Sequence, residues 1–301
     1  MRCMLDAHPL IRCGEETRLI PRMLFFANSP RPNDASSFEQ SGITQDTFDS
    51  AVSSFMLEII VRHGKPAQNL CNKDPFVLKF SEYVTRLFPN SKFILMIRDA
   101  RATVHSIISR KVGISGFRPN DYNGSFVQWN KLIEQMYSQC MVVGPTRCLP
   151  VYYEQLVLKP EKSMKTILKF LNISWSDAVL NHEQYIGDEI SLSKVEKSTD
   201  QVIKPVNLEA LTSWVNKIPE NILDSLDSIA PMLKKLGYDT KSRLPNYGEA
   251  DQKVRDNTLH IQENRDYWIN IARKYAVPEN TTRNNTILYK PVGNIANKVV
   301  F

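Results

Sequence analysis

The sequence predicts an α/β fold in which helices flank a mainly parallel sheet. Helix-like and strand-like segments alternate along the 301 residues, a pattern typical of this class. The clearest strand, Lys92 to Ile97, is a continuous apolar run, as expected of a strand covered on both faces. Apolar residues make up 42% of the chain, so it can bury a substantial core.

The elements follow in order from the periodicity and from the residues that interrupt it. Apolar residues recur at helical spacing from Asp46 to His63, and Gly64 and Pro66 end that helix. The same reasoning predicts, in chain order, a strand at 69–75 that ends in a polar loop, a helix at 76–87, the strand at 92–97 with a helix to about 110, and a strand at 149–153 with a helix at 161–171.

Two more helices are predicted from Leu208 onward, with Pro219 at the start of the second and Gly237 at its end. Beyond about Asn257 the sequence is polar and has Asn-rich turns. No internal repeat or linker precedes this part, so the chain is divided into one domain, residues 1–258, and a divergent tail, residues 259–301.

The formal net charge is +6 and the pI is about 9.0. A basic net charge of this size reflects either positive charge spread over the surface, which aids solubility, or a binding site for an anionic partner. Nucleic acid ranks last among partners, because no Lys/Arg run or basic helix stripe is present. No apolar stretch approaches the roughly 20 residues that span a bilayer, and no signal-peptide pattern opens the chain; taken alone, these features predict a soluble cytosolic protein.

Five cysteines, at positions 3, 13, 71, 140 and 148, form no C-x-x-C pair, and the histidines are scattered. A zinc or other metal site is therefore disfavoured. Four Asn-x-Ser/Thr sequons, at positions 123, 172, 280 and 284, lend slight support to a lumenal location.

A phosphate site is one interpretation of the residues that follow the strand at 92–97. Arg98 stands at the carboxyl end of this strand, where ligands bind in open parallel sheets. Ser106 and Arg110 are four residues apart on the next helix and so share one face. Together the three suit a phosphate dianion; the alternative is that Arg98 pairs with a carboxylate and the helix residues are solvated.

The segment Cys13 to Arg18, followed by Pro21 and Arg22, sets two acids beside two arginines. One interpretation is a capped helix start with surface ion pairs. The other is a carboxylate general base beside a cationic groove for an acidic substrate.

Seven segments, in order, together resemble protein-tyrosine sulfotransferases. They are MLDAHP (4–9), RCGEETR (12–18), LCNKDPF (70–76), RDAR (98–101), YEQLVL (153–158), SLSKVE (191–196) and STDQVIKPVN (198–207). Because the match is collinear to about Thr258, the chain is identified as a member of that family. The resemblance implies a P-loop-containing nucleoside triphosphate hydrolase-like (sulfotransferase) fold and a Golgi-lumenal enzyme.

The resemblance also implies the reaction: sulfate passes from 3′-phosphoadenylyl sulfate (PAPS) to tyrosines in acidic segments of secreted or membrane proteins. By the family's pattern Glu16 is the catalytic base, and Lys73 and Ser198 stabilise the charge that develops as sulfate transfers. A base is required because a phenol with a pKa near 10 is a poor nucleophile. No metal is involved, and the family suggests a homodimer.

The same correspondence implies the binding residues. The cofactor would be held by Arg98, Ser106, Arg110, Tyr153, Ser198, Thr199, Asp200, Gln201, Val202, Ile203, Lys204, Pro205, Val206 and Asn207. The acidic peptide would meet Arg18, Leu19, Ile20, Pro21 and Arg22. The cysteines match the family's disulfides, Cys13 with Cys71 and Cys140 with Cys148, which need an oxidising compartment; the Golgi lumen therefore replaces the cytosol as the expected location.

The chain departs from the family at two places. The family's strand and Pro-Arg-Ser-Gly-Thr-Thr loop, which grips the 5′-phosphosulfate, would precede Arg2, and no substitute occurs in the 301 residues. Ser213 stands where the family has a cofactor-binding Lys. We therefore expect negligible sulfate transfer by the chain as written. Two interpretations follow: a shortened sulfotransferase, or a catalytically dead family member that binds peptides or dimerises. A carbohydrate sulfotransferase is the competing enzyme class.

Overall fold

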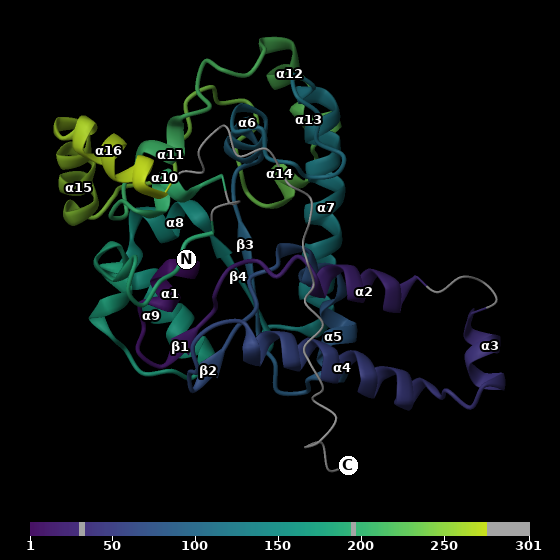
Figure 1. Cartoon of the computed structure of the whole chain (residues 1–301). Helices are drawn as coiled ribbons and strands as arrows, with labels where there is room; N and C mark the ends of the chain where they lie inside the picture. Colours follow the sequence, from purple (N-terminus) through teal and green to yellow (C-terminus); the bar gives the residue numbers. More distant parts are fainter. Residues whose placement is uncertain (30–33, 194–196, 276–301) are drawn as a thin grey trace.

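A computed structural model describes residues 1–29, 34–193 and 197–275 of the chain (Figure 1). In chain order its helices and strands are α1 Arg2–Asp6, β1 Ile11–Arg12, α2 Ile20–Asn28, α3 Asp34–Gln40, α4 Gln45–Arg62, β2 Asn69–Leu70, η1 Pro75–Phe80, α5 Ser81–Leu87, β3 Phe93–Ile97, α6 Ala100–Ser109, α7 Tyr122–Val143, β4 Cys148–Tyr152, α8 Tyr153–Leu158, α9 Pro160–Leu171, η2 Asp177–Leu180, η3 His182–Tyr185, α10 Thr199–Val202, α11 Glu209–Thr212, α12 Glu220–Asp224, α13 Leu226–Ile229, α14 Met232–Lys235, α15 Gln252–Glu263 and α16 Arg265–Tyr275.

The strands confirm the predicted α/β class with parallel pairing. β3 pairs with β4 over five residues, from Phe93 opposite Cys148 to Ile97 opposite Tyr152. β1 pairs with β2 over two residues, and within the described residues the two pairs are separate sheets. Because every strand in these pairs is parallel to its neighbour, the loops that follow the strands, with the predicted residues Glu16, Lys73 and Arg98, leave from carboxyl strand ends.

Helices cover both faces of β3, as its apolar run predicts. Leu95 and Ile97 face a core to which the long helix α7 contributes, and Figure 1 shows α7 running beside this sheet. Ile94 and Met96 face the other way, onto a core that includes Met164 of α9. The hydrophobic contacts on both sides hold β3 and its terminal loop in place.

The helix predicted at 46–63 is α4, whose first turn is capped by the Thr44 side chain. The helix predicted at 76–87 is interrupted: a 3₁₀ segment, η1, follows Asp74 before the α-helix α5 begins at Ser81. Pro75 at the first helical position favours this tight start. The sequence pattern did not reveal α7, although it is the longest helix of the described residues.

The last predicted helix, between Pro219 and Gly237, is three short helices, α12, α13 and α14. Ala230 leaves the helical conformation at φ −141° and ψ 57°, and Pro231 has no backbone N–H, so the pattern cannot continue as one helix. Gly237 ends the segment at φ +87°, as predicted.

Polar turns were predicted beyond residue 257, and up to residue 275 that prediction is wrong. The chain there forms α15 and α16, because Val254, Thr258 and Ile261 recur at helical spacing and are buried on one side of α15. The division at residue 258 falls inside α15 and stays a prediction. Residues 276–301 lie outside the described residues.

Candidate active site

The loops after β1 and β2 are joined covalently. Cys13 and Cys71 form a disulfide with their Cα atoms 4.4 Å apart, and Cys140 and Cys148 form a second one between α7 and β4. Both predicted pairs are therefore confirmed, and Cys3 is a buried thiol. The first bridge ties the segment that holds Glu16 to the loop that holds Lys73.

Asp74 fixes the two loops against each other. Its side chain is 5% exposed, and its carboxylate accepts hydrogen bonds from the backbone N–H groups of Thr17 and Arg18 at 3.3 and 2.8 Å. It also accepts from the Thr17 hydroxyl at 2.5 Å and from the Asn72 amide at 2.7 Å. Arg18 adopts a left-handed backbone, φ +56°, which this set of bonds holds in place.

Glu16 and Lys73 meet at the open side of these loops. Lys73 Nζ lies 2.7 Å from Glu16 Oε1, and the two side chains are 32% and 25% exposed. Arg18 Nε lies 3.8 Å from the other Glu16 oxygen. A half-buried carboxylate with one cation in contact and another nearby can accept a proton from a group that approaches from solvent.

The predicted peptide-binding segment has two faces. Arg18 and Arg22 are exposed, and Leu19 is 36% exposed. Ile20 and Pro21 begin α2 and are buried, so their side chains face the core. The side chains available to a peptide are therefore Arg18, Leu19 and Arg22.

At the end of β3, Arg98 stacks on Tyr153, which follows β4. The guanidinium carbon lies 4.6 Å from the ring centroid, and Nη2 donates to the Ala210 carbonyl at 2.8 Å. Arg98 Nε is buried and has no hydrogen-bond partner among the described residues. Burial raises the pKa of Tyr153, so its hydroxyl is neutral at physiological pH.

Arg110 links the end of α6 to α10. Its guanidinium contacts the Asp200 carboxylate at 2.6 and 3.1 Å and donates to the Lys197 carbonyl at 2.7 Å. Ser106 lies one turn earlier, and its carbonyl accepts from the Arg110 N–H. The sequence left open that Arg98 pairs with a carboxylate. In the structure it is Arg110, at the end of α6, that pairs with one, Asp200.

The segment 198–207 contacts Arg110 through Asp200. Ser198 is exposed at the start of α10, and no contact between Ser198 and the Glu16–Lys73 pair is found among the described residues. Lys204 pairs with Glu209 at 2.9 Å, while Ile203 is buried. The remaining members are half-buried or, like Asp200, exposed: Thr199, Asp200, Gln201, Val202, Pro205, Val206 and Asn207.

A buried polar network that the sequence did not reveal lies behind Arg98 and Tyr153. Asp99 N donates to Glu154 Oε1 at 2.9 Å, and Arg101 binds the Asp99 carboxylate, at 2.6 Å for its closest nitrogen. The hydroxyls of Tyr238 and Tyr247 donate to Glu154 and Asp99, each at 2.8 Å. The contacts cross from the end of β3 to the end of β4, so they fix the spacing of the two strand ends.

Comparison with known proteins decides the family. The sulfotransferase family profile matches residues 1–177. The chain is 57% identical to chicken protein-tyrosine sulfotransferase 2 over 265 residues, which cover 87% of this chain and 71% of that protein. It is 55% identical to zebrafish protein-tyrosine sulfotransferase 1, with 87% and 75% covered, and 53% identical to protein-tyrosine sulfotransferase A of Caenorhabditis elegans, with 89% and 71% covered.

The chain belongs to the protein-tyrosine sulfotransferases, a family of transferases. Two solved sulfotransferase domains share its fold. The domain from the curacin biosynthetic pathway has a TM-score of 0.56 at 17% identity and covers 79% of this chain and 92% of its own. The domain from the olefin synthase of Synechococcus PCC 7002 has a TM-score of 0.52 at 19% identity, with 79% and 89% covered.

Residues predicted from the sequence thus gather at two corners of the site: the loops after β1 and β2, and the loops after β3 and β4. Glu16, Lys73 and Arg18 lie together at the β1 and β2 ends, and Arg98 meets Tyr153 at the β3 and β4 ends. Asp74, Asp99 and Glu154 were missed as site-holding residues. The available signal was their position, each directly after a predicted functional residue.

Proposed function

We propose that this chain carries the catalytic and binding residues of an enzyme that transfers sulfate from PAPS to tyrosine hydroxyls in acidic segments of secreted or membrane proteins, giving tyrosine O-sulfate and adenosine 3′,5′-bisphosphate. The observation that carries the proposal is the 2.7 Å contact between Glu16 and Lys73, in a chain 53–57% identical to protein-tyrosine sulfotransferases. A base and a cation held together suit the activation of a phenol and the stabilisation of transferring charge.

In the proposed reaction Glu16 accepts the phenolic proton of the substrate tyrosine as its oxygen attacks sulfur. Lys73 balances the negative charge that develops on the bridging oxygen, and Ser198 assists by a hydrogen bond. The Asp74 hydrogen bonds hold the base-bearing loop, which limits the reorganisation needed during transfer.

PAPS supplies the activated sulfuryl group when it is bound. Arg98, Ser106, Arg110, Tyr153 and residues 198–207 would hold its nucleotide half. The buried Arg98 Nε, which has no partner among the described residues, fits this group because a 3′-phosphate oxygen would satisfy it. The Arg110–Asp200 pair would orient the second arginine toward the same phosphate.

The exposed Arg18 and Arg22 support an acidic peptide as the acceptor. Arg18 lies beside Glu16 and Arg22 follows in the first turn of α2, so carboxylates near a substrate tyrosine would meet cations as the hydroxyl reaches the base. Attraction of this kind raises the association rate and fixes orientation. A glycan acceptor would gain little from these arginines.

The two disulfides support passage through an oxidising compartment, and we assign the chain to the Golgi lumen. Among the helices of the described residues, none has the length and apolarity to cross a bilayer. Labelling of free thiols in the protein from its native cells tests the location: the lumenal protein has Cys13 and Cys71 protected, whereas a reduced pair contradicts it.

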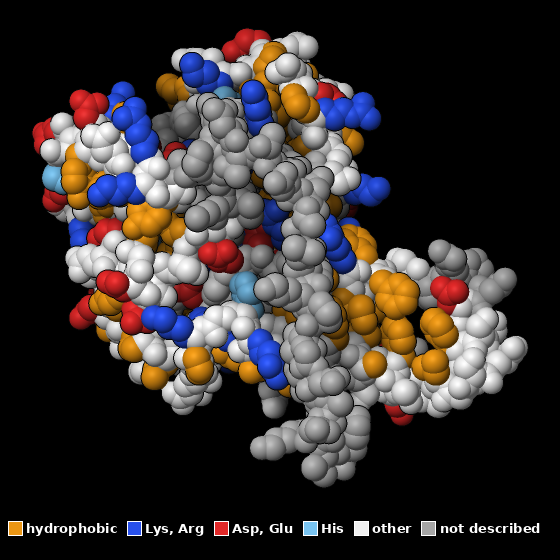
Figure 2. Space-filling model, viewed as in Figure 1, with side chains coloured by type: hydrophobic (Ala, Val, Ile, Leu, Met, Phe, Trp, Pro, Cys, Tyr) orange, Lys and Arg blue, Asp and Glu red, His pale blue; other side chains and the backbone are white. Residues whose placement is uncertain are grey.

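We also propose a homodimer. Phe26 of α2 is 55% exposed, and Leu57 and Val61 of α4 are 51% and 46% exposed. Figure 2 shows hydrophobic side chains gathered over this part of the molecule, and patches of this kind mark association surfaces. Sedimentation velocity measures the state directly, and a monomer at micromolar concentration contradicts the proposal.

Transfer of labelled sulfate to an acidic tyrosine peptide, and binding of adenosine 3′,5′-bisphosphate, together test the function. Within the 301 residues no segment has the form of the family's phosphosulfate loop, so transfer is measured both for this chain and for one extended by that strand and loop. We expect the nucleotide to bind both chains, and the extension to raise transfer to the tyrosine peptide but not to its Phe counterpart.

Glu16→Gln in the extended chain should lower kcat by about 10²–10⁴-fold, the usual contribution of a general base, with nucleotide affinity unchanged. Glu161→Gln, the same change in an exposed ion pair on α9, is the matched control. If the extended chain sulfates glycans and not the peptide, a carbohydrate sulfotransferase replaces the proposal. Nucleotide binding without transfer to either acceptor indicates a catalytically dead member.

A further inference from the structure

Two segments that leave the Glu16 corner meet again further along the chain. The Asp74 carboxylate accepts a hydrogen bond from the Arg18 N–H, just before α2, and Asp74 itself directly precedes η1. Phe25 of α2 then packs edge-on against Phe80 of η1, with the ring centroids 5.0 Å apart. The two segments therefore start together beside the base and are in contact again at this aromatic pair.

Two lysines lie at this aromatic pair. Lys79 Nζ is 4.6 Å from the centroid of the Phe25 ring, and the Lys79 side chain is half-buried. η1 also packs against α7, which carries the exposed Lys131. Burial lowers the pKa of Lys79, and the positive charge of Lys131 lowers it further. No carboxylate of the described residues opposes this repulsion at Lys79.

The aromatic pair is separate from the apolar surface assigned to the homodimer. Phe25 turns toward η1, whereas Phe26 turns toward α4, where its ring centroid lies 6.2 Å from that of Phe48. Arg22 is exposed and lies one helical turn before Phe25. A peptide that passes Arg22 would next meet Phe25 and Lys79, and it would leave the dimer surface free.

We infer that Lys79 and Lys131 form a subsite of the acceptor groove that binds a carboxylate of the peptide three or four residues from the tyrosine. This inference rests on the proposed acceptor, an acidic segment of a protein. Two ammonium groups held close together without an opposing acid attract an anionic side chain. The carboxylate would relieve the repulsion between them.

The distance from the base sets the position of that carboxylate in the peptide. A 3₁₀ segment rises about 2 Å per residue, which places Lys79 roughly 10 Å from Lys73. An extended peptide advances about 3.3 Å per residue. With the tyrosine hydroxyl at Glu16, a residue three or four positions away therefore reaches Lys79. An acid next to the tyrosine would meet Arg18 instead, because Arg18 lies beside Glu16.

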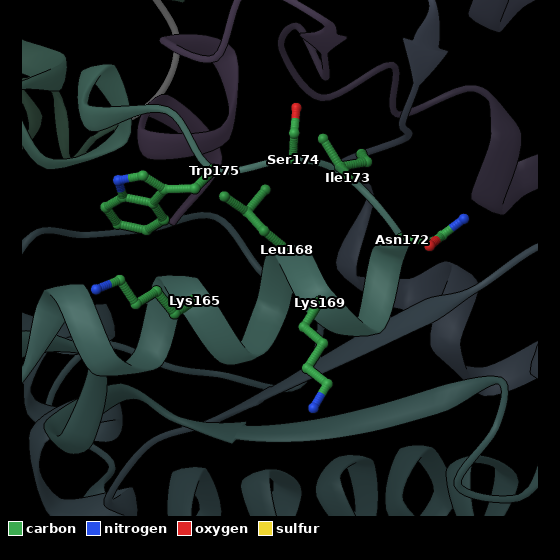
Figure 3. Close-up of a pocket in the computed structure, with 7 residues that line it drawn as sticks. All are labelled: Lys165, Leu168, Lys169, Asn172, Ile173, Ser174 and Trp175. Carbon is green, nitrogen blue, oxygen red and sulfur yellow. The ribbon is translucent and has the colours of Figure 1, made fainter.

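Another pair of lysines supplies the matched control. Lys165 and Lys169 line a cavity of about 430 Å³ beside α9, and Figure 3 shows their side chains pointing apart. Lys165 also pairs with Glu161 at 2.5 Å, so its charge is balanced within the protein. Removing these two charges changes the net charge as much as removing those of Lys79 and Lys131 does.

Fluorescence anisotropy with the full chain and labelled peptides tests the subsite. Each peptide has one tyrosine and carries aspartates either next to it or three and four residues away on both sides, and each is compared with its Asn counterpart. The wild type should bind the distal-aspartate peptide about three- to tenfold more tightly than its counterpart. Lys79→Gln with Lys131→Gln should abolish this ratio and leave the preference for adjacent aspartates unchanged.

Three further variants separate charge from packing. Lys79→Arg with Lys131→Arg keeps both charges and should keep the ratio, as should Lys165→Gln with Lys169→Gln. Lys131→Gln alone, an exposed change that leaves the Phe25 contact in place, should lower the ratio in part. A wild type without the distal preference, or the same ratio in the wild type and in Lys79→Gln with Lys131→Gln, overturns the inference. Neither result bears on the transfer reaction, which nucleotide binding and labelled sulfate decide.

Discussion

The two corners of the site are held by different means. At the ends of β1 and β2, strands of two residues each, a disulfide joins the loops and Asp74 accepts hydrogen bonds from across them. At the ends of β3 and β4, strands of five residues each, the described residues form no covalent link. Asp99 and Glu154 join the loops there.

The comparison indicates that the short β1–β2 pair relies on a disulfide to hold its loops, whereas the longer β3–β4 pair holds its loops without one. A two-residue ladder contributes few hydrogen bonds, so its loops need a covalent restraint to keep Glu16 within 2.7 Å of Lys73. The five-residue ladder already fixes β3 against β4, and a buried polar network is enough to set the loop geometry there.

Both corners nevertheless share one arrangement along the chain. In each corner, functional side chains are followed directly by a buried carboxylate that accepts a backbone or hydroxyl hydrogen, which holds for three of them. The carboxylates are 5%, 0% and 3% exposed. The pairs are Lys73 with Asp74, Arg98 with Asp99, and Tyr153 with Glu154. A buried charge is costly unless it is bonded in this way, so these acids hold the loops only while their donors stay in place.

The largest effect is expected for Asp99→Ala. Its removal leaves the buried Arg101 guanidinium without a counter-charge, which costs about 3–5 kcal/mol of unfolding free energy. Asp74→Ala leaves only neutral donors unpaired, for a cost of about 1–3 kcal/mol. Urea unfolding under oxidising conditions measures both values.

The exposed pair Glu58–Arg62 supplies the control for this comparison. Glu58→Gln should change the unfolding free energy by less than about 1 kcal/mol. Equal costs for Asp99→Ala and Asp74→Ala would show that the two carboxylates restrain their loops equally, and the contrast between the corners would then rest on the disulfide alone.

Much of this arrangement could be predicted from the sequence. The apolar run at 93–97 and its polar ending placed β3 and Arg98, and family resemblance gave both disulfides. The buried acids could not be predicted, because a lone Asp or Glu after a strand is ordinarily exposed. Glu154 and Asp99 are bonded by Tyr238 and Tyr247, more than 80 residues away.

Local breaks in periodicity were predicted less well than strands. The interruption between α13 and α14 had a local signal in Pro231, which has no backbone N–H, but the apolar spacing continues across it from Leu226 to Leu233 and predicted one helix. In α15 the apolar positions are few, and polar residues outnumber them. The helix is stable only because Val254 and Ile261 are buried by the rest of the fold.

The next largest effect separates the two disulfides. In the chain-entropy view, Cys13→Ser with Cys71→Ser opens a crosslink with a sequence separation of 58 and costs about 4 kcal/mol, while Cys140→Ser with Cys148→Ser opens one of 8 and costs about 2.5 kcal/mol. Thermal unfolding measures the two losses. Only the first double variant should also lower sulfate transfer, and an equal loss of transfer in both would contradict a local role at the Glu16 corner.

The smallest effect concerns Glu154 and pH. Burial raises the pKa of Glu154, although hydrogen bonds from the Asp99 N–H and the Tyr238 hydroxyl oppose the rise. A raised pKa means that the folded chain holds this proton to a higher pH than the unfolded chain does. The stability linked to the proton is therefore fully present below the ordinary pKa, near 4.3, and is lost as pH rises through the folded value.

Glu154→Gln has no such proton, so the free energy of unfolding of the wild type relative to this variant should be highest at acidic pH and should fall toward neutral pH. Urea midpoints at pH 4 to 8 for both chains measure the difference. Tyr238→Phe sharpens the experiment, because it removes a donor that favours the ionised form and should shift the fall to higher pH. If the unfolding free energy of the wild type relative to Glu154→Gln instead rises toward neutral pH, the hydrogen bonds outweigh burial. Glu154 then holds the Tyr153 corner as a stabilised carboxylate, as Asp99 does beside Arg101.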